Sequence, residues 1–546
     1  MQPSPVPSAS FSPARTLAAA RAFVAEGQHD AARTAFRAAA DAFAAAGRSG
    51  GAARAWLALG ELERRLGRTE AAQQAFDRAD AGLGATAHAW AEGALTRARG
   101  RLADQRGQIE DARRLYRAAE AACHEARDRL GHAHALLELG LLEARLYRAD
   151  EARTALSDAR ALYRQAEDPL GEANVLKGLG HLEVRLNRTG EARTAYAAAQ
   201  ALYRGVKGRL GEAGTLLALG YLEQRVNRLD AAQAAFAEAA QAYRDAGSRL
   251  GEANARCSLG FLLQRRMDSA LTAAAWHDTR AAFEEAGRLY AQAGSVLGRA
   301  HVLKGLADLD SQGAPPGPAA RVEEASAARQ APGAVAGGSQ RAPTDAALDG
   351  YRRAEAAYRE AGDPIGQGNA WFALGSLLRR LNRPDEAQQA YAEALSLYND
   401  CSNRIGQANV LKGLGHLQTD AGEFESARSD YLSALDGYRE IGGQLGQANA
   451  QLALGELELR AGNLGAARAG LRAALSLYQG LRHPLGQGQA CFAMARLTEQ
   501  DGPGSTRAAE VRDWLEQAEE RFRSAGCEAL ATLMRRRLAA VDLPPA

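Results

Sequence analysis

One pattern of apolar and polar positions recurs about every 40 residues along the chain. Within residues 170–208, the first half carries leucines spaced by three, three and four residues, namely Leu176, Leu179, Leu182 and Leu186. The second half carries small and aromatic residues spaced by four, three and four, namely Ala192, Tyr196, Ala199 and Tyr203. Both spacings are typical of an amphipathic helix, and the polar pair Asn187-Arg188 between them predicts a short turn. Each period is therefore expected to fold as two helices.

A small residue marks one position of every period and serves as its anchor. It is found at Gly60, Gly100, Gly140, Gly180, Gly220, Gly260, Ala307, Gly375, Gly415, Gly455 and Ala495, and one period earlier at Ala20. These anchors define twelve repeats. We expect Gly180 to let two helix backbones approach while Tyr196 fills the space beyond. Gly205 and Gly208 are expected to end the second helix, because glycine tolerates a positive φ.

Two repeats carry a recognisable motif. Trp56-x2-Leu59-Gly60 is followed by Ala72-x3-Phe76, and Trp371-x2-Leu374-Gly375 is followed by Ala387-x3-Tyr391. This pattern resembles the tetratricopeptide repeat family. The resemblance implies an all-α, right-handed superhelical solenoid of about twelve helix-turn-helix repeats, closed by a C-terminal capping helix. The 40-residue period is similar to that of Pins-type adaptors, kinesin light chains and bacterial peptide-sensing regulators, and we expect its extra residues to fall between units.

The spacing of the anchors also predicts the boundaries. Residues 1–12 are expected to form a disordered tail, and residues 13–311 hold repeats 1–7 and the first helix of repeat 8. Residues 312–343 are rich in Gly, Ala, Pro, Ser and Gln without an apolar face, which predicts a disordered insertion. Residues 344–526 complete repeats 8–12, and residues 527–546 form the capping helix and tail. The insertion is interpreted either as a tolerated loop or as a tether, partner motif or cover for the groove.

Composition excludes several classes of protein. A formal net charge of +2 argues against a dedicated nucleic-acid binder, which usually carries a strong basic excess. The sequence contains no run of 18 apolar residues, which a membrane-spanning helix would need. The first 12 residues do not resemble a signal peptide. The five cysteines are scattered, as expected of thiols in a reducing cytosol. We therefore expect a cytoplasmic protein that binds neither nucleic acid nor membrane.

The resemblance places the first helix of each repeat along a concave groove. Four positions are expected to face it, six and three residues before the anchor and one and five residues after it, since these share one helix face. The groove residues singled out in this way are Asn174, Lys177, His181, Arg185, Tyr221, Arg225, Asn254, Phe261, Arg265, Lys304, Asn369, Phe372, Arg380, Asn409, Lys412, His416 and Asn449.

Each class of groove residue has a functional and a simpler interpretation. An asparagine amide can donate to and accept from an extended peptide backbone, and a lysine suits a carboxylate. The family has a carboxylate clamp of Lys and Asn, but these lysines lie in repeats 5, 8 and 10, too dispersed for one clamp. Duplication of one unit explains both sets equally well. The apolar positions suit an amphipathic partner or are half-buried by tight winding, and the arginines favour an acidic segment or are paired with glutamates.

Sequence motifs for catalysis are missing. No lysine is followed by Ser or Thr, which excludes a Walker A loop, and the chain has no HExxH or Cys/His metal spacing. We therefore predict a non-enzymatic scaffold or adaptor, without cofactor or metal, that binds a partner peptide or helix in its groove. The alternatives are a peptide- or ligand-responsive regulatory sensor and a self-assembling structural protein, so self-association is left open.

Overall fold

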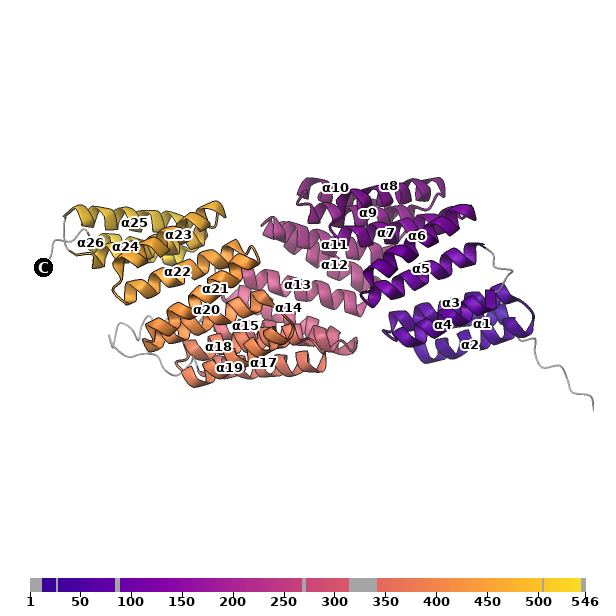
Figure 1. The fold of residues 1–546 in the computed structure, drawn as a ribbon, viewed down its shortest axis with the longest axis horizontal. Helices are drawn as coiled ribbons and strands as arrows, with labels where there is room; N and C mark the ends of the chain where they lie inside the picture. Colours follow the sequence, from indigo (N-terminus) through magenta and orange to yellow (C-terminus); the bar gives the residue numbers. More distant parts are fainter. Residues whose placement is uncertain are drawn as a thin grey trace, which may run out of the picture. The chain divides into compact units, whose positions relative to one another are not determined.

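The computed structural model describes residues 12–25, 28–83, 89–267, 272–313, 341–502 and 505–541. In this part of the chain every regular element is a helix and no strand is present (Figure 1). A typical repeat consists of two 17-residue helices, each followed by a three-residue turn, which accounts for the period of 40. The all-α repeat fold predicted from the sequence is confirmed.

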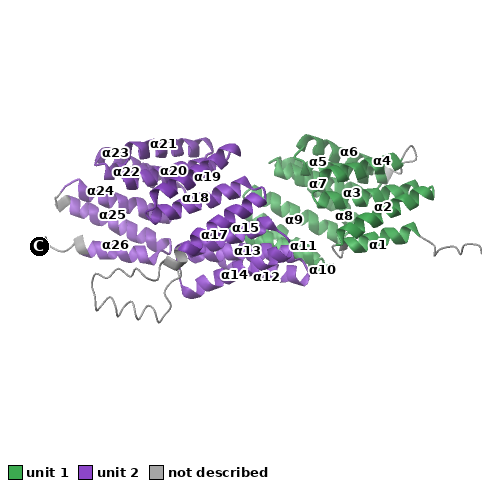
Figure 2. Cartoon of the chain, turned by 90° about the horizontal axis from the view of Figure 1, so that it is seen from below, with its two compact units in different colours: residues 1–227 green, residues 228–546 purple. Residues whose placement is uncertain are grey.

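The chain divides into two compact units, residues 1–227 and 228–546 (Figure 2). Unit 1 contains α1 (Pro13–Ala25), α2 (His29–Ala45), α3 (Ser49–Arg65), α4 (Thr69–Leu83), α5 (Ala89–Gln105), α6 (Ile109–Glu125), α7 (Arg129–Arg145), α8 (Ala149–Gln165), α9 (Pro169–Arg185), α10 (Thr189–Gly205) and α11 (Arg209–Arg225). Unit 2 contains α12 (Leu229–Asp245), α13 (Arg249–Met267), α14 (Ala273–Gln292), α15 (Val296–Gln312), α17 (Arg341–Glu360), α18 (Pro364–Arg380), α19 (Pro384–Asp400), α20 (Arg404–Ala421), α21 (Phe424–Glu440), α22 (Gln444–Arg460), α23 (Leu464–Gly480), α24 (Pro484–Gln500), α25 (Ser505–Ser524) and α26 (Glu528–Val541).

Within each unit the helices pack as antiparallel neighbours in chain order. The first helix of a repeat packs on its own second helix, as α9 does on α10 and α20 does on α21. First helices of consecutive repeats also contact one another, as in α5–α7–α9 of unit 1 and α18–α20–α22 of unit 2. Where described helices separated by one other helix along the chain pack on each other, both are first helices. The first helices therefore form the inner layer of each unit, and α26 packs against α25 at the C-terminal end.

The anchor glycine brings the two helices of a repeat together. A Cβ added at Gly180 would lie 2.4 Å from Cε1 of Tyr196, which is closer than any real contact. The same arrangement joins Gly60 to Phe76 and Gly415 to Tyr431. Because the aromatic ring occupies the space that a side chain would need, the backbone of the first helix rests directly on that ring.

A second glycine brings consecutive repeats together. Pro169 opens α9, and the side chain of Asp168 accepts a hydrogen bond from the Gly171 amide at 3.0 Å, which caps the helix. A Cβ at Gly171 would lie 2.1 Å from the ring of Tyr163 in the preceding repeat. The extra residues of the long repeat, expected between units, thus belong largely to the first turn of the helix and carry an inter-repeat contact.

The end of the second helix differs from the sequence-based expectation. Neither Gly205 nor Gly208 has a positive φ; Lys207 adopts the left-handed conformation instead, with φ of 55°. Other non-glycine residues occupy the same kind of turn position, including Asn187 with φ of 59°. Repeated backbone hydrogen bonds across these turns, such as Gly208 N to Tyr203 O at 2.7 Å, hold the conformation without requiring glycine.

Repeat 8 contains the predicted insertion. α15 and α17 pack on each other, and Ala307, Ala347 and Tyr351 share one core cluster, so the two helices complete one repeat. Most of the expected insertion, residues 314–340, lies outside the described residues, as do residues 1–11 of the expected N-terminal tail and residues 542–546. The division into expected disordered and folded segments therefore stays a prediction.

Ion pairs join the second helix of one repeat to the first helix of the next. An arginine of one second helix reaches a buried glutamate 30 residues later, on the first helix of the next repeat. Examples are Arg113 with Glu143 at 2.5 Å and Arg428 with Glu458 at 2.6 Å. Glu143 is 1% exposed, so removing Arg113 would leave a buried carboxylate without its close partner. Arg428 binds Glu458 through two nitrogens, and Asn463 donates a further bond at 2.7 Å.

We expect Gly180→Ala to lower the free energy of unfolding by about 1–3 kcal/mol, because the new methyl group overlaps the Tyr196 ring. Gly190→Ala is the matched control, since a Cβ there meets nothing within 4 Å and the residue is exposed on α10. Urea unfolding followed by circular dichroism measures both. Equal midpoints for the two variants would contradict the role given to the anchor.

A second expectation concerns pH. The hydrogen bond from Arg428 lowers the pKa of Glu458 below its ordinary value of 4.5. A carboxyl group with a lowered folded-state pKa adds stability above its unfolded pKa and loses it as the pH falls through the folded value. Glu458→Gln should therefore cost about 1–3 kcal/mol at pH 7 and less at pH 3.

The control for this variant is Glu425→Gln, which removes another partner of Arg428 whose side chain is 88% exposed. It should change stability by no more than about 0.5 kcal/mol. Urea midpoints at pH 7 and pH 3 give the comparison. A Glu458→Gln effect that is the same at both pH values would show that the lost charge is not its cause.

Candidate functional site

The sequence-predicted groove residues all lie on first helices. In unit 1, α9 carries Asn174, Lys177, His181 and Arg185, and α11 carries Tyr221 and Arg225. In unit 2 the others lie on α13 (Asn254, Phe261, Arg265), α15 (Lys304), α18 (Asn369, Phe372, Arg380), α20 (Asn409, Lys412, His416) and α22 (Asn449). Helical spacing places the members on each helix on one face. Because the two units are separate bodies, each holds its own part of the set.

Each of the five asparagines accepts a hydrogen bond from a tyrosine of the same repeat. Tyr203 donates its hydroxyl to Oδ1 of Asn174 at 2.6 Å. The equivalent pairs are Tyr290 with Asn254 at 2.7 Å, Tyr398 with Asn369 at 2.7 Å, Tyr438 with Asn409 at 2.6 Å and Tyr478 with Asn449 at 2.6 Å. The bond fixes the orientation of the amide, because only its oxygen can accept. The Nδ2 groups have no acceptor among the described residues, so each amide presents donors.

The two histidines are held in a similar manner. Nδ1 of His181 lies 2.8 Å from the Tyr196 hydroxyl, and Nδ1 of His416 lies 2.7 Å from that of Tyr431. Burial raises the pKa of both tyrosines, which therefore keep their protons at neutral pH. We assign the hydroxyl as donor, and this places the proton of the neutral imidazole on Nε2. Each ring then adds one further outward donor.

Lys177 and Lys412 stand near these histidines without a carboxylate partner in the described part of the chain. Both are half-buried, and burial lowers the pKa of each ammonium group. The Lys177 ammonium lies 6.0 Å from the centre of the Tyr203 ring. A partly desolvated cation without an anion is a site for an incoming acidic group. We name Asn174, Lys177 and His181 the repeat-5 donor set, and Asn409, Lys412 and His416 the repeat-10 donor set.

Lys304 differs from the other two lysines. Its ammonium group forms an ion pair with Asp308 at 2.7 Å, and Asp308 also accepts a hydrogen bond from Tyr351 at 2.8 Å. Asp308 occupies the position that His181 holds in repeat 5. The positive charge of Lys304 is therefore already neutralised within its own helix, and the structure does not group it with the two donor sets.

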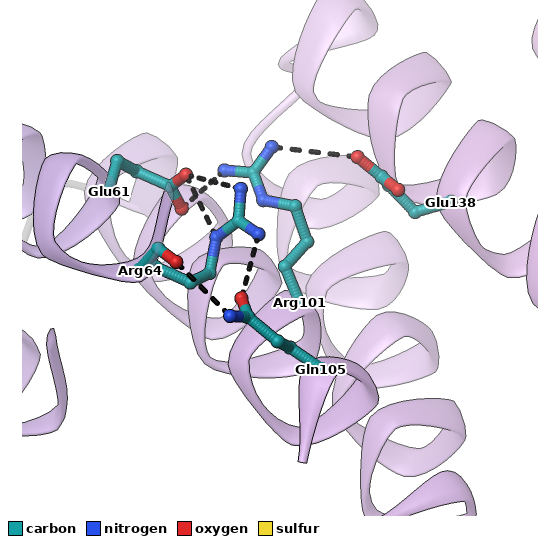
Figure 3. A network of polar contacts seen from close by, with 5 residues as sticks. All are labelled: Glu61, Arg64, Arg101, Gln105 and Glu138. Atoms are coloured by element: carbon teal, nitrogen blue, oxygen red, sulfur yellow. Dashed lines mark hydrogen bonds and ion pairs between the residues drawn. The ribbon is translucent and has the colours of Figure 1, made fainter. Parts of the chain in front are cut away.

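A network of ion pairs and hydrogen bonds joins the first helices of repeats 2–4 (Figure 3). Arg101 of α5 binds Glu61 of α3 at 2.7 Å and Glu138 of α7 at 3.5 Å. Glu61 also accepts from Arg64 at 3.2 Å, and the Gln105 amide links to Arg64. Arg97 of α5 has no ion-pair partner among the described residues and burial lowers its pKa, so the network does not balance all the charge on this face.

The remaining predicted positions have varied environments. The Arg185 guanidinium lies 4.6 Å from the centre of the Tyr147 ring, and Arg225 donates to the Val184 carbonyl at 2.6 Å. Arg265 and Arg380 are exposed on α13 and α18. Among the apolar positions, Tyr221 is 50% exposed, Phe261 packs edge-on against Phe283 and Phe372 packs near Tyr391. These aromatic side chains therefore contribute partly to the core and partly to the surface.

A cavity of about 530 Å³ lies beside the repeat-5 donor set, between α7 and α9. Its apolar walls come from α7 and α9, and its polar lining comprises His181, Asp104, Glu138, Arg145 and Arg185. A larger cavity of about 760 Å³ lies on the opposite face of α9. Its arginines Arg153 and Arg160 are paired with glutamates, so that side offers no free cation comparable to Lys177.

Sequence reasoning missed the tyrosines that orient the site. The signal was present, because in four repeats a tyrosine follows the asparagine by 29 residues. In repeat 7 the separation is 36, which reflects its seven extra residues. The spacing of the tyrosines predicts only helix packing, because the apolar ring of a tyrosine accounts for it without any role for the hydroxyl.

The family comparison identifies the repeats. The family described as tetratricopeptide repeat matches residues 53–80 and 368–401, which are α3–α4 and α18–α19. The chain is a tetratricopeptide-like repeat protein. The two matched segments are those in which the tryptophan motif is present, and the other repeats have the anchor without that tryptophan. No curated protein matches the chain.

Several solved structures resemble this tetratricopeptide-like protein, and the apo form of RapI shares its fold. The apo form of RapI is 10% identical, with a TM-score of 0.51 over 71% of this chain and 98% of that one. A Rap protein in complex with competence and sporulation factor is 14% identical, with a TM-score of 0.42 over 75% and 97%. Yeast Tom70 is 13% identical, with a TM-score of 0.37 over 89% and 95%. At these identities the similarity concerns the fold alone.

None of the described helices is long and apolar enough to cross a membrane. No group of three or more His, Cys, Asp or Glu side chains in the described ranges is placed to hold a metal ion.

We expect His181 and His416 to stay neutral in mildly acidic solution. Burial, followed by the charge of Lys177, lowers the pKa of His181 to about 4. The pKa of His416 is also lowered to about 4, by burial first and then by the charges of Arg379 and Lys412. His181 is exposed by surface area, so its lowered pKa requires that the surrounding wall reduce its hydration. Because the unfolded ring takes up a proton near pH 6.5, this effect lowers stability as the pH falls from about 6.5 to 4.

Imidazole NMR titration of the wild type and Lys177→Gln measures these midpoints. The variant should raise the midpoint of His181 and leave that of His416 unchanged, since His416 belongs to the other unit. A wild-type midpoint of about 6.5 for His181 would mean that water access outweighs the protein wall.

Proposed function

We propose that this protein is a non-catalytic adaptor that binds an extended, acidic segment of a partner protein along the inner face of its first helices. The observation that carries the proposal is the orientation of the asparagines. Their oxygens are occupied by tyrosine hydroxyls, so the face offers Nδ2 donors at corresponding positions of repeats 5, 7, 9, 10 and 11.

A face of donors favours an acceptor-rich ligand. The backbone carbonyls of an extended peptide are free to accept, whereas those of a helix are bonded within the helix. Carboxylates in the same segment would complement Lys177 and Lys412, for which the described residues supply no anion. Electrostatic complementarity of this kind contributes to specificity and to the rate of association. Tetratricopeptide-like and other solenoids use such extended inner surfaces for binding.

The donor sets are present once in each unit. The repeat-5 set lies in unit 1 and the repeat-10 set in unit 2, with the same Asn, Lys and His at the same spacing. Each set also has the same pair of tyrosines behind it. We propose that each unit binds an acidic segment by itself, so that two segments of one partner can bind together with a gain from effective concentration.

The test uses a fluorescein-labelled 12-residue peptide in which glutamate alternates with serine. We expect Lys177→Gln and Lys412→Gln each to weaken its binding to that unit about fivefold, a loss of about 1 kcal/mol. The double variant should lose both. Fluorescence anisotropy at low and physiological salt measures the affinity, and binding should weaken as salt rises.

Lys207→Gln is the matched control, because Lys207 is an exposed lysine in the turn after α10 and away from the inner face. It should bind the peptide as the wild type does. Failure of the wild type to bind any acidic peptide, or equal losses in the control and the donor-set variants, would overturn the proposal.

A further inference from the structure

An exposed aliphatic residue recurs at the second position of the first helix. In unit 1 it is Leu130, Leu170 and Leu210, and in unit 2 it is Leu250, Leu297, Ile365, Ile405 and Leu445. These side chains are between 42% and 58% exposed. We call the two sets the unit-1 row and the unit-2 row. Isolated exposed leucines are common, but eight at one position of a repeat form a continuous feature of each unit.

The rows are not required by the core. At the start of α9, Gly171, the residue after Leu170, makes the contact with the previous repeat by packing on Tyr163. The cap is made by Asp168. Leu170 takes part in neither, and a polar residue at its position would keep both contacts. A recurring apolar side chain that is half in water therefore calls for a further contact.

Each row runs beside the donors of the inner face. Leu170 precedes Asn174 by four residues on α9, and Ile405 precedes Asn409 by four on α20. Residues four apart lie on the same helix face. Helical side chains lean toward the N-terminus, so the aliphatic residue forms the edge of the face on which asparagine donates. A segment bound to the asparagines would therefore have one side against the row.

The spacing along a row restricts the conformation of that segment. Consecutive first helices contact one another, so their axes lie about 8–10 Å apart. A polyproline II segment rises about 3.1 Å per residue with three residues per turn, which repeats one face about every 9 Å. In a β-strand, side chains three residues apart lie on opposite faces, so side chains at every third position would point alternately toward the row and away from it. An α-helix could match the distance with about seven residues, but its carbonyls would not be free for the asparagines.

We propose that each row is a docking edge for an acidic partner segment in polyproline II conformation, with an aliphatic side chain at every third position. The aliphatic side chains contact the row, the backbone carbonyls accept from the asparagine amides, and the carboxylates lie near Lys177 or Lys412. This inference rests on the proposed function, which supplies the acceptor-rich ligand, and it adds the conformation and the periodicity of that ligand.

Four labelled 15-residue peptides test the periodicity on the full chain. The first repeats Leu-Glu-Pro five times, the second repeats Ser-Glu-Pro, and the third has the composition of the first with its leucines in one block. The fourth is an acidic amphipathic helix with leucines three and four residues apart. We expect the first to bind at least tenfold more tightly than each of the others in fluorescence anisotropy.

The outcomes separate the two proposals. Equal binding of the Leu-Glu-Pro and Ser-Glu-Pro peptides would overturn the role of the rows while leaving the acidic adaptor intact. Tighter binding of the helical peptide would overturn the polyproline II conformation. If no acidic peptide binds, the proposed function itself fails, and this inference fails with it.

Variants of the unit-2 row give a second measurement. Leu297→Gln, Ile365→Gln and Ile405→Gln combined should weaken binding of the Leu-Glu-Pro peptide to unit 2 about tenfold and leave the Ser-Glu-Pro peptide unaffected. The control combines Leu432→Gln and Ile441→Gln, which are 46% and 37% exposed but lie outside the row. Equal losses in both would contradict the assignment. If the row variant loses its helical circular dichroism signal, the peptide comparison on the unmodified chain decides.

Discussion

The packing of tyrosine rings against glycine backbones is the contact on which both the array and its inner face depend. The Tyr203 ring lies against Gly211 of the next repeat, while its hydroxyl holds Asn174. Tyr431 likewise contacts Gly415 with its ring and His416 with its hydroxyl. A buried tyrosine needs a partner for its hydroxyl, and here that partner is a residue of the inner face. Stacking of the repeats and orientation of the donors are thus properties of the same side chains.

Electrostatics vary along an otherwise regular backbone. Arginine and glutamate pairs recur between the second helix of one repeat and the first helix of the next and stabilise their stacking, as in Arg153 with Glu183. On the inner side, the balance changes from one repeat to the next. Arg101 is neutralised by two glutamates and Lys304 by Asp308, whereas Lys177 and Lys412 have no such partner in the described structure. Arg97 of repeat 3, at the position equivalent to Lys177, also has no ion-pair partner among the described residues, so an unpaired cation is not confined to repeats 5 and 10.

The period, the helix pairs and the anchor contact were predictable from the sequence, because a 40-residue repeat and a three-and-four spacing follow directly from helix geometry. The prediction that a glycine would supply the positive φ after α10 was wrong, because Lys207 adopts that conformation instead. Steric rules say which residue types prefer a positive φ, but they do not say which position of a turn will adopt it. The asparagines were expected to donate and accept equally. Their actual role depends on a tyrosine 29 residues away, and hydrogen-bond direction is a tertiary property. The pairing of Lys304 was readable from the sequence, because Asp308 follows it by four residues where Lys177 has His181.

The two donor sets have an alternative explanation, in which one repeat was duplicated and its residues were kept without any role in binding. Duplication explains why Asn, Lys and His recur together, but it does not explain why divergence has spared this group. At the equivalent position of repeat 8 the histidine is replaced by Asp308, and the lysine is then neutralised. The fold therefore tolerates a substitution that removes the free charge. Repeats 5 and 10 retain partly buried lysines whose pKa is lowered by desolvation, an arrangement that is unfavourable for the isolated protein. An acidic ligand would relieve this unfavourable free state, which is the physical argument for the proposed binding role of these two positions.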